Sequence, residues 1–206
     1  MTACTGRKPP EAGPSAAEPA IPKPDRVQHN RLRDSCVQLL RTGDLALRTG
    51  NDITSRMFCE FNRIDKTYSH CGMVVVEHGY PFVYHSIGGE DNPDQRLRRD
   101  SAHFFFSPEN NLGLGIARYR LADSVLGRLQ QTVWHWYRRQ PRFDMNFDLE
   151  TDDRLYCSEF IYKALSAATG DPDFVPSTYV YGRRFIGIDN LFINPHTDLV
   201  CELKYK

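Results

Sequence analysis

The sequence predicts an α+β domain in which an antiparallel sheet packs against helices. Segments rich in β-branched and aromatic residues are joined by tight turns, as in Cys71–Glu77 and Phe82–Ile87, which flank Gly79-Tyr80-Pro81. Other segments place apolar residues at helical spacing. Strands joined by tight turns form antiparallel sheets, and helices packed on such a sheet give the α+β class.

The elements expected around this hairpin follow one another without a second linker or an internal repeat. In chain order they are a helix over Arg31–Arg41, a strand over Leu45–Arg48, a helix opened by Asn51 or Asp52, the hairpin, a polar loop over Glu90–Arg99, a strand over Gly115–Leu121, a helix from Asp123 or Ser124 to Pro141, a helix over Ser158–Thr169 ended by Gly170, and a strand over Leu199–Tyr205. The second helix is expected to bury its apolar residues, which are Ile53, Met57, Phe58, Phe61 and Ile64.

Composition excludes several classes of protein. The 206 residues include 26 Lys+Arg and 26 Asp+Glu, so the net charge is zero and no nucleic-acid partner is expected. Hydrophobic residues make up 40% and aromatic residues 12%, too many for a wholly disordered chain. No uninterrupted apolar run approaches the roughly 20 residues of a membrane span.

Residues 1–30 are expected to form a flexible leader, and residues 31–206 a single domain. The leader holds six of the 13 prolines, lacks aromatic residues, and has only Ile21 and Val27 as branched aliphatic residues. Such a segment cannot bury enough apolar surface to offset the entropy lost on ordering.

Cys4, in Met1-Thr2-Ala3-Cys4, has two interpretations. It is either an ordinary terminal cysteine or the lipid-modified cysteine of a bacterial lipoprotein, in which a Pro-rich tether often follows. The basic segment and apolar core of a signal peptide are missing here. Lipidation at Cys4 is the one membrane attachment expected, and it implies the periplasm or outer membrane; otherwise a cytoplasmic location is expected. The six cysteines form no CxxC pair, so the sequence alone leaves the redox compartment open.

Cys157 is the strongest candidate for a reactive group. It lies at the start of a predicted helix, where unpaired N–H groups and the positive end of the helix dipole favour a thiolate. The same N–H groups can stabilise an oxyanion during acyl transfer. His70, which enters a strand, can serve as the base, and His85 on the next strand can orient it. From these residues alone, a buried structural cysteine at a helix start is also an open interpretation, because free cysteines are often simply core residues.

Metal binding is the third interpretation of these residues. Zinc is bound by Cys and His, and Cys71 stands next to His70. Adjacent residues of a strand point to opposite faces, however, so His70 and Cys71 cannot easily share one ion. No metal and no cofactor is therefore expected.

An ordered set of motifs resembles a known family. It comprises Gly43-Asp44 before a strand, Tyr68-Ser69-His70-Cys71-Gly72-Met73-Val74, the polar residue His85 in the next strand, Arg118-Tyr119-Arg120-Leu121, and Phe143-Asp144-Met145-Asn146-Phe147 leading into Leu155-Tyr156-Cys157-Ser158-Glu159-Phe160. In this order and spacing, the chain from Gly43 to Gly170 resembles the circularly permuted papain-like hydrolases of the YiiX and YaeF type, relatives of the NlpC cell-wall peptidases.

The resemblance implies a permuted papain-like, NlpC-type fold, with Cys157 as nucleophile and His70 as base. The permutation places His70 before Cys157, the reverse of the papain order. The third position, which orients the histidine, falls on His85, where many relatives carry a carboxylate. The flanking residues Tyr156, Ser69 and Glu159 are candidate substrate contacts, although each has an alternative structural role.

Three functions follow as hypotheses. The first is a cysteine amidase or peptidase that acts through a thioester on small amides or cell-wall peptides. The second is a thiol acyltransferase or lipid acyl hydrolase that resembles lecithin:retinol acyltransferase, which also uses a second histidine; Phe104-Phe105-Phe106 could then line a groove for the acyl lipid. The third is a non-catalytic binding module. The expected partner is thus a small amide, a peptide or an acyl lipid.

Overall fold

The computed structural model describes residues 24–89, 92, 94–180 and 182–205. Cys4 and most of the expected leader lie outside these residues. The helices are α1 (Pro24–Val37), α2 (Ile53–Cys59), α3 (Ala102–Phe105), α4 (Asp123–Arg139), α5 (Cys157–Thr169) and α6 (Ile188–Phe192). The strands are β1 (Asp44–Gly50), β2 (His70–Glu77), β3 (Tyr80–His85), β4 (Arg98–Ser101), β5 (Asn111–Tyr119), β6 (Thr178–Val180), β7 (Arg183–Phe185) and β8 (Thr197–Lys204).

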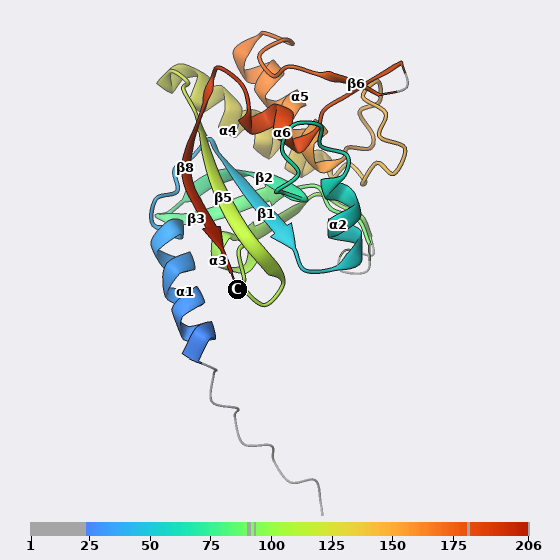
Figure 1. Ribbon diagram of the computed structural model, residues 1–206. Helices are drawn as coiled ribbons and strands as arrows, with labels where there is room; N and C mark the ends of the chain where they lie inside the picture. Colours follow the sequence, from blue (N-terminus) through green and yellow to red (C-terminus); the bar gives the residue numbers. More distant parts are fainter. Residues whose placement is uncertain (1–23, 90–91, 93, 181, 206) are drawn as a thin grey trace, which may run out of the picture.

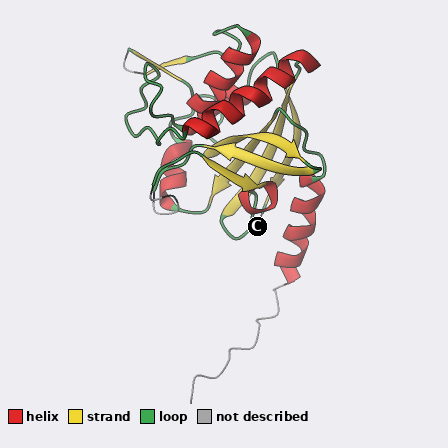
Figure 2. Cartoon of the chain, turned by 180° about the vertical axis from the view of Figure 1, so that it is seen from behind, coloured by secondary structure: helices red, strands yellow, loops and turns green. Residues whose placement is uncertain are grey.

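The predicted α+β class is confirmed. An antiparallel sheet has the strand order β4-β3-β2-β1-β5-β8, and β6 pairs with β7 in a separate hairpin. Helices α4 and α5 cover one face of the large sheet, while α1 and α3 lie against the other (Figures 1 and 2). Antiparallel pairing follows from the tight turns between strands, such as the one at Gly79, whose φ is +84°.

Two apolar layers hold the fold together. The larger one lies between the sheet and helices α4 and α5, and contains Met73, Leu129 and Phe160, all at most 1% exposed. The smaller one lies on the opposite face, and contains Phe106 and Ile116. Side chains along β2 alternate between the two faces of the sheet and so contribute to both layers: Met73 lies in the larger one and Val74 in the smaller one.

Several element boundaries differ from the sequence-based expectation. Helix α1 begins at Pro24 and ends at Val37, so residues 24–30 of the expected leader are helical. The expected loop Glu90–Arg99 runs into a strand, because Arg98 and Arg99 pair with His85 and Tyr84 at the edge of the sheet. Polar side chains obscured this strand in the sequence.

The prediction for α2 was wrong in two respects, its length and the burial of its apolar face. Asp52 does cap the helix, since its carboxylate accepts a hydrogen bond from Ser55 N at 2.8 Å. The helix ends at Cys59, however, and its expected buried face is exposed: Ile53 by 77% and Met57 by 64%. Helical spacing shows which residues share a face, but it does not show whether another element covers that face.

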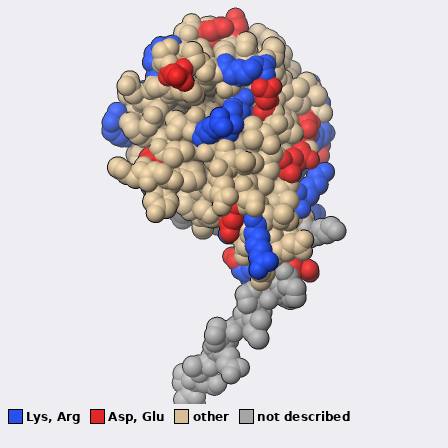
Figure 3. Space-filling model, turned by 90° about the vertical axis from the view of Figure 1, so that its left-hand side faces the viewer, with Lys and Arg blue, Asp and Glu red and all other residues tan. Residues whose placement is uncertain are grey.

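Charge on the visible surface is mixed. Figure 3 shows the side of the molecule where β8 and α1 lie, with acidic and basic residues interspersed among uncharged side chains. This face has no large patch of one sign. None of the helices in the described part of the chain is long and apolar enough to cross a membrane.

Candidate active site

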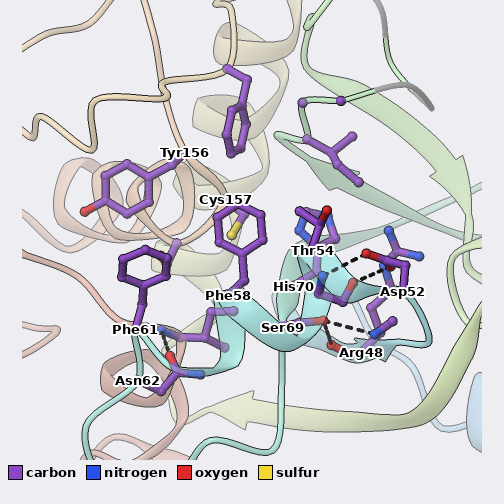
Figure 4. Close-up of a pocket in the computed structure, with 18 of the residues that line it drawn as sticks. Arg48, Asp52, Thr54, Phe58, Phe61, Asn62, Ser69, His70, Tyr156 and Cys157 are labelled. Atoms are coloured by element: carbon purple, nitrogen blue, oxygen red, sulfur yellow. Dashed lines mark hydrogen bonds between the residues drawn. The ribbon is translucent and has the colours of Figure 1, made fainter.

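A pocket of about 630 Å³ lies beside the amino-terminal end of α5 (Figure 4). Cys157, the first residue of α5, and His70, the first residue of β2, both line it. Ser69 and Tyr156, two of the expected substrate contacts, line it as well. The structure thus gathers most of the predicted site residues around one cavity.

Cys157 has the surroundings of a stabilised thiolate. A hydrogen bond from the Cys71 thiol lowers the pKa of Cys157, as do bonds from the N–H groups of Cys71 and Ser158, while burial opposes them. Cys71 itself is completely buried, and burial raises its pKa well above the ordinary range. Of the two neighbouring thiols, Cys157 is therefore the more acidic.

His70 is held by a line of hydrogen bonds that crosses three strands. Its Nε2 lies 2.9 Å from Nδ1 of His85, and Nε2 of His85 lies 3.0 Å from Oδ2 of Asp100. Arg98 donates to the other carboxylate oxygen of Asp100 at 2.9 Å. His70 is on β2, His85 on β3 and Asp100 on β4, so the sheet itself sets these spacings.

This line of bonds fixes the tautomers. Burial lowers the pKa of His70 well below its ordinary value, and nearby Arg48 lowers it further. Burial also lowers the pKa of His85 to about 4, although Asp100 opposes this effect. Both rings are therefore neutral at pH 7. Because Asp100 accepts from His85 Nε2–H, His85 Nδ1 accepts from His70 Nε2–H, and His70 Nδ1 keeps its lone pair.

Asp100 is the site residue that sequence reasoning missed. It lies in Arg98–Ser101, which was expected to be partly loop, and no motif marks it. Burial raises the pKa of Asp100, but His85 and Arg98 more than offset this, so the carboxylate stays ionised. A carboxylate thus lies beyond His85, one strand farther from His70 than the predicted orienting position.

Among the described residues, no hydrogen bond joins Cys157 to His70. The polar contacts of the sulfur run to Cys71 and Ser158, and Nε2 of His70 is occupied by His85. Catalytic hydrogen bonds are often long before substrate binds and shorten in the complex. The shared pocket leaves Nδ1 of His70 as the nitrogen available to a reacting group.

Glu159 has a structural position. It is completely buried, does not line the pocket, accepts a hydrogen bond from Tyr156 N at 3.1 Å, and lies 3.1 Å from Lys163 Nζ. Burial raises the pKa of Glu159 to about 8 against the opposing effect of Lys163. The residue closes the first turn of α5, a role that the spacing from Tyr156 to Glu159 could have indicated.

Tyr156 and Ser69 shape the pocket walls. The Tyr156 hydroxyl accepts a hydrogen bond from Ile186 N at 3.1 Å, and its ring stacks on Phe185 at 5.4 Å. Ser69 Oγ accepts a hydrogen bond from Gly50 N at 3.0 Å, which joins the end of β1 to the residue before β2. Both side chains are buried and face the cavity only in part.

One side of the pocket is an aromatic wall, made of Phe58, Phe61, Phe147, Tyr156 and Phe185. Each ring contacts at least one other at a centroid distance between 5.2 and 6.2 Å. Phe147 lies at its centre and has a φ of +53°, an unfavourable value for a bulky residue. Its packing against the other rings holds this conformation.

The expected groove at Phe104–Phe106 does not form part of this cavity. Phe105 and Phe106 are buried in the smaller apolar layer, and Phe104 is 55% exposed. Of the exposed apolar residues of α2 and of the segment after it, Phe61 belongs to the aromatic wall, whereas Ile53, Met57 and Ile64 do not line the pocket.

The chain is similar over most of its length to a solved crystal structure. This is the crystal structure of YiiX, a metalloprotein from Escherichia coli O157:H7. The TM-score is 0.64 at 18% sequence identity, and the match covers 80% of this chain and 98% of YiiX. The chain has a YiiX-like fold. No protein-family model and no curated protein matches the sequence.

A metal ion does not fit the described residues. YiiX is described as a metalloprotein. Within the described ranges of this chain, however, no three His, Cys, Asp or Glu side chains are grouped so that they could hold an ion. His70, His85 and Asp100 bond to one another in a line, and do not converge on a common point. No step of the chemistry below is assigned to a metal.

Proposed function

We propose that this protein is a cysteine hydrolase of the amidase or peptidase type, with the permuted papain-like arrangement of the NlpC enzymes. The observation that carries the proposal is the pairing, in one pocket, of a cysteine whose pKa is lowered at a helix start with a histidine oriented toward a carboxylate through His85. A structural cysteine needs neither the pocket nor the hydrogen-bonded line behind His70.

The first half-reaction forms a thioester. Cys157 Sγ attacks the acyl carbon of the substrate, and His70 Nδ1 takes the thiol proton. The N–H groups of the first turn of α5 donate to the oxyanion of the tetrahedral intermediate. As the carbon–nitrogen or carbon–oxygen bond breaks, His70 returns the proton to the leaving group.

The second half-reaction releases the acid. Water attacks the thioester carbon and gives a proton to His70, and the intermediate then expels Cys157 Sγ. The proton returns to the thiolate–histidine pair, and a carboxylic acid leaves. Asp100 stabilises the positive charge that His70 and His85 share while His70 holds the proton.

Small amides and cell-wall peptides are the substrates that the family resemblance favours. A second candidate, an acyl lipid, is favoured by the aromatic wall. An acyl chain of the substrate can lie against Phe58, Phe61 and Phe147, while its carbonyl carbon lies at Cys157. A lipid acyl hydrolase and a thiol acyltransferase share the first half-reaction, and differ in whether water or an alcohol or amine accepts the acyl group.

The test measures the reactivity of the cysteines before any substrate is chosen. The iodoacetamide alkylation rate of each cysteine is followed against pH by mass spectrometry, in the native protein and in His70→Ala. Cys157 is expected to react fastest, with a thiolate pKa below ~8.5 in both proteins, because the hydrogen bonds that lower this pKa come from Cys71 and Ser158 and not from His70. Ordinary titration of Cys157 would favour the binding-module hypothesis.

Substrate screening then separates the two candidate functions. Nitroanilides of short peptides and nitrophenyl esters of graded acyl chains are incubated with the native protein and with Cys157→Ala. Turnover of peptide amides supports the amidase. Turnover confined to long acyl esters supports the lipid enzyme, and acyl transfer to an added amine identifies a transferase. Equal turnover by Cys157→Ala would exclude the thioester mechanism.

A further inference from the structure

Two cysteines far from the pocket lie next to each other. Cys36, near the end of α1, and Cys201, in β8, are 165 residues apart in sequence, yet their sulfur atoms are 2.7 Å apart. Cys36 is buried, and Cys201 is partly exposed. Neither lines the pocket around Cys157, so their chemistry is separate from the proposed catalytic reaction.

The surroundings of this pair hold the two backbones in place. Cys201 pairs with Ile116 across the ladder between β8 and β5, next to an irregularity in register. Cys36 packs with Val37 and Leu40 in the smaller apolar layer, against which Cys201 also packs. Both sulfurs are therefore fixed by regular structure, and small side-chain rotations would bring them to bonding distance.

The contact between Cys36 and Cys201 lies at the end of a helix, α1, that has few other contacts with the sheet. The helix runs along the outside of the sheet beside the edge strand β8 (Figure 1). Its first half is largely exposed, and a ring contact between His29 and Tyr205 at 5.5 Å is one of its few links to the sheet. A covalent bond at Cys36 would fasten the helix at the point where it reaches the core.

We propose that Cys36 and Cys201 form a disulfide bond that fastens α1 to the sheet. Each thiol loses one hydrogen atom, and a disulfide oxidant such as oxidised glutathione takes up the two protons and two electrons, leaving as two molecules of reduced glutathione. The bond closes a loop through most of the chain, and long loops gain the most from such a crosslink. It is expected to form in an oxidising compartment and to open in a reducing one.

The other close pair of sulfurs, Cys71 and Cys157, is a poorer candidate for a disulfide bond. Cys71 and Cys157 are hydrogen-bonded, but Cys71 is completely buried, and a bond to it would consume the proposed nucleophile. Cys59 is buried, its sulfur contacts the carbonyl oxygen of Thr67 at 4.0 Å, and none of its contacts within the described residues is to another cysteine. It therefore supplies a matched control.

The test uses the full chain, equilibrated either with oxidised glutathione or with excess reductant, then denatured and alkylated without reduction. Peptide mapping of the oxidised sample is expected to find Cys36 and Cys201 in one crosslinked peptide. Its melting temperature is expected to exceed that of the reduced sample by roughly 5–15 °C. Cys59→Ser should keep both results, and Cys201→Ser should lose both.

Two outcomes would overturn the proposal. One is full alkylation of Cys36 and Cys201 after treatment with oxidised glutathione. The other is a crosslink that joins different cysteines, such as Cys71 to Cys157. A crosslink without a change in melting temperature would refute the fastening of α1, because a bond across 165 residues that constrains the unfolded chain must stabilise the folded one.

Discussion

The Nε2 atom of His70 lies 2.9 Å from Nδ1 of His85, so one proton is shared between two buried neutral rings. The direction of this bond depends on Asp100, whose carboxylate accepts a hydrogen bond from His85 Nε2–H at 3.0 Å. The carboxylate thus reaches the proposed base through an intervening imidazole. Asp100 is a positioning residue, and it acts on Cys157 only through His85 and His70.

Replacement of Asp100 by Asn tests this relationship. An amide can donate to His85 Nε2 and reverse the line of protons, so His70 would hold its proton on the nitrogen that faces the pocket. We expect kcat to fall by ~10²-fold or more with little change in KM. The matched control is Glu77→Gln, which removes a neighbouring carboxylate bound to Arg99 at 2.5 Å and should leave kcat within about twofold.

Gly72 permits the close packing of the two histidines. A Cβ at Gly72 would lie 2.9 Å from the carbonyl oxygen of Tyr84 and 3.0 Å from His85 Cβ, and would overlap Val83 Cγ1. Gly72→Ala should therefore lower stability by about 1–3 kcal/mol and reduce activity together with it. Gly127→Ala in α4 is the control, because a Cβ there meets nothing within 4 Å. It should raise stability by ~0.5–1 kcal/mol in urea unfolding.

Stability should fall in mild acid because of the buried histidines. The folded pKa of His85 is about 4, below the ~6.5 expected in the unfolded chain, so the unfolded state binds more protons between these values. The contribution of neutral His85 to the free energy of unfolding is fully present above pH 6.5, and it is lost as the pH falls toward 4. The loss from His85 is on the order of 3 kcal/mol between pH 7 and pH 4, and His70 adds to it.

Urea unfolding at pH 7 and pH 4 measures this dependence. His85→Gln should remove much of it, because Gln can still donate to Asp100 but does not titrate. His135→Gln, at an exposed position of α4, should leave the pH dependence as it is in the native protein. An unchanged pH profile in His85→Gln would contradict the assignment of the acid loss to this residue.

The aromatic wall predicts a dependence on acyl-chain length. Each methylene group that the wall covers should stabilise the bound substrate by ~0.8 kcal/mol, which is about fourfold in kcat/KM. Phe61→Ser should flatten this dependence and leave the shortest ester unaffected. Equal kcat/KM for all chain lengths in the native protein would favour the peptide-amide substrates instead.

The sequence was sufficient to predict the fold class, the strands of the central hairpin and the position of Cys157 at a helix start. These features rest on local signals: β-branched runs, turn residues and the pattern before α5. Asp100 and the exposure of Ile53 could not be predicted, because both depend on which element packs beside them. Glu159 was ambiguous for the same reason, since a carboxylate at a helix start can either cap the helix or face a ligand.

Asn62 connects the two sides of the pocket, and this connection has a consequence for folding. Its side chain donates to Tyr68 O at 2.8 Å and accepts from Ile188 N, 126 residues farther along the chain, at 2.9 Å. Contacts of such sequence separation form late, because closing a long loop loses entropy before any contact is gained. A refolding chain should therefore regain its helical signal first and its assembled pocket last. Any ligand that fills the cavity would then act as a template for this final step of assembly.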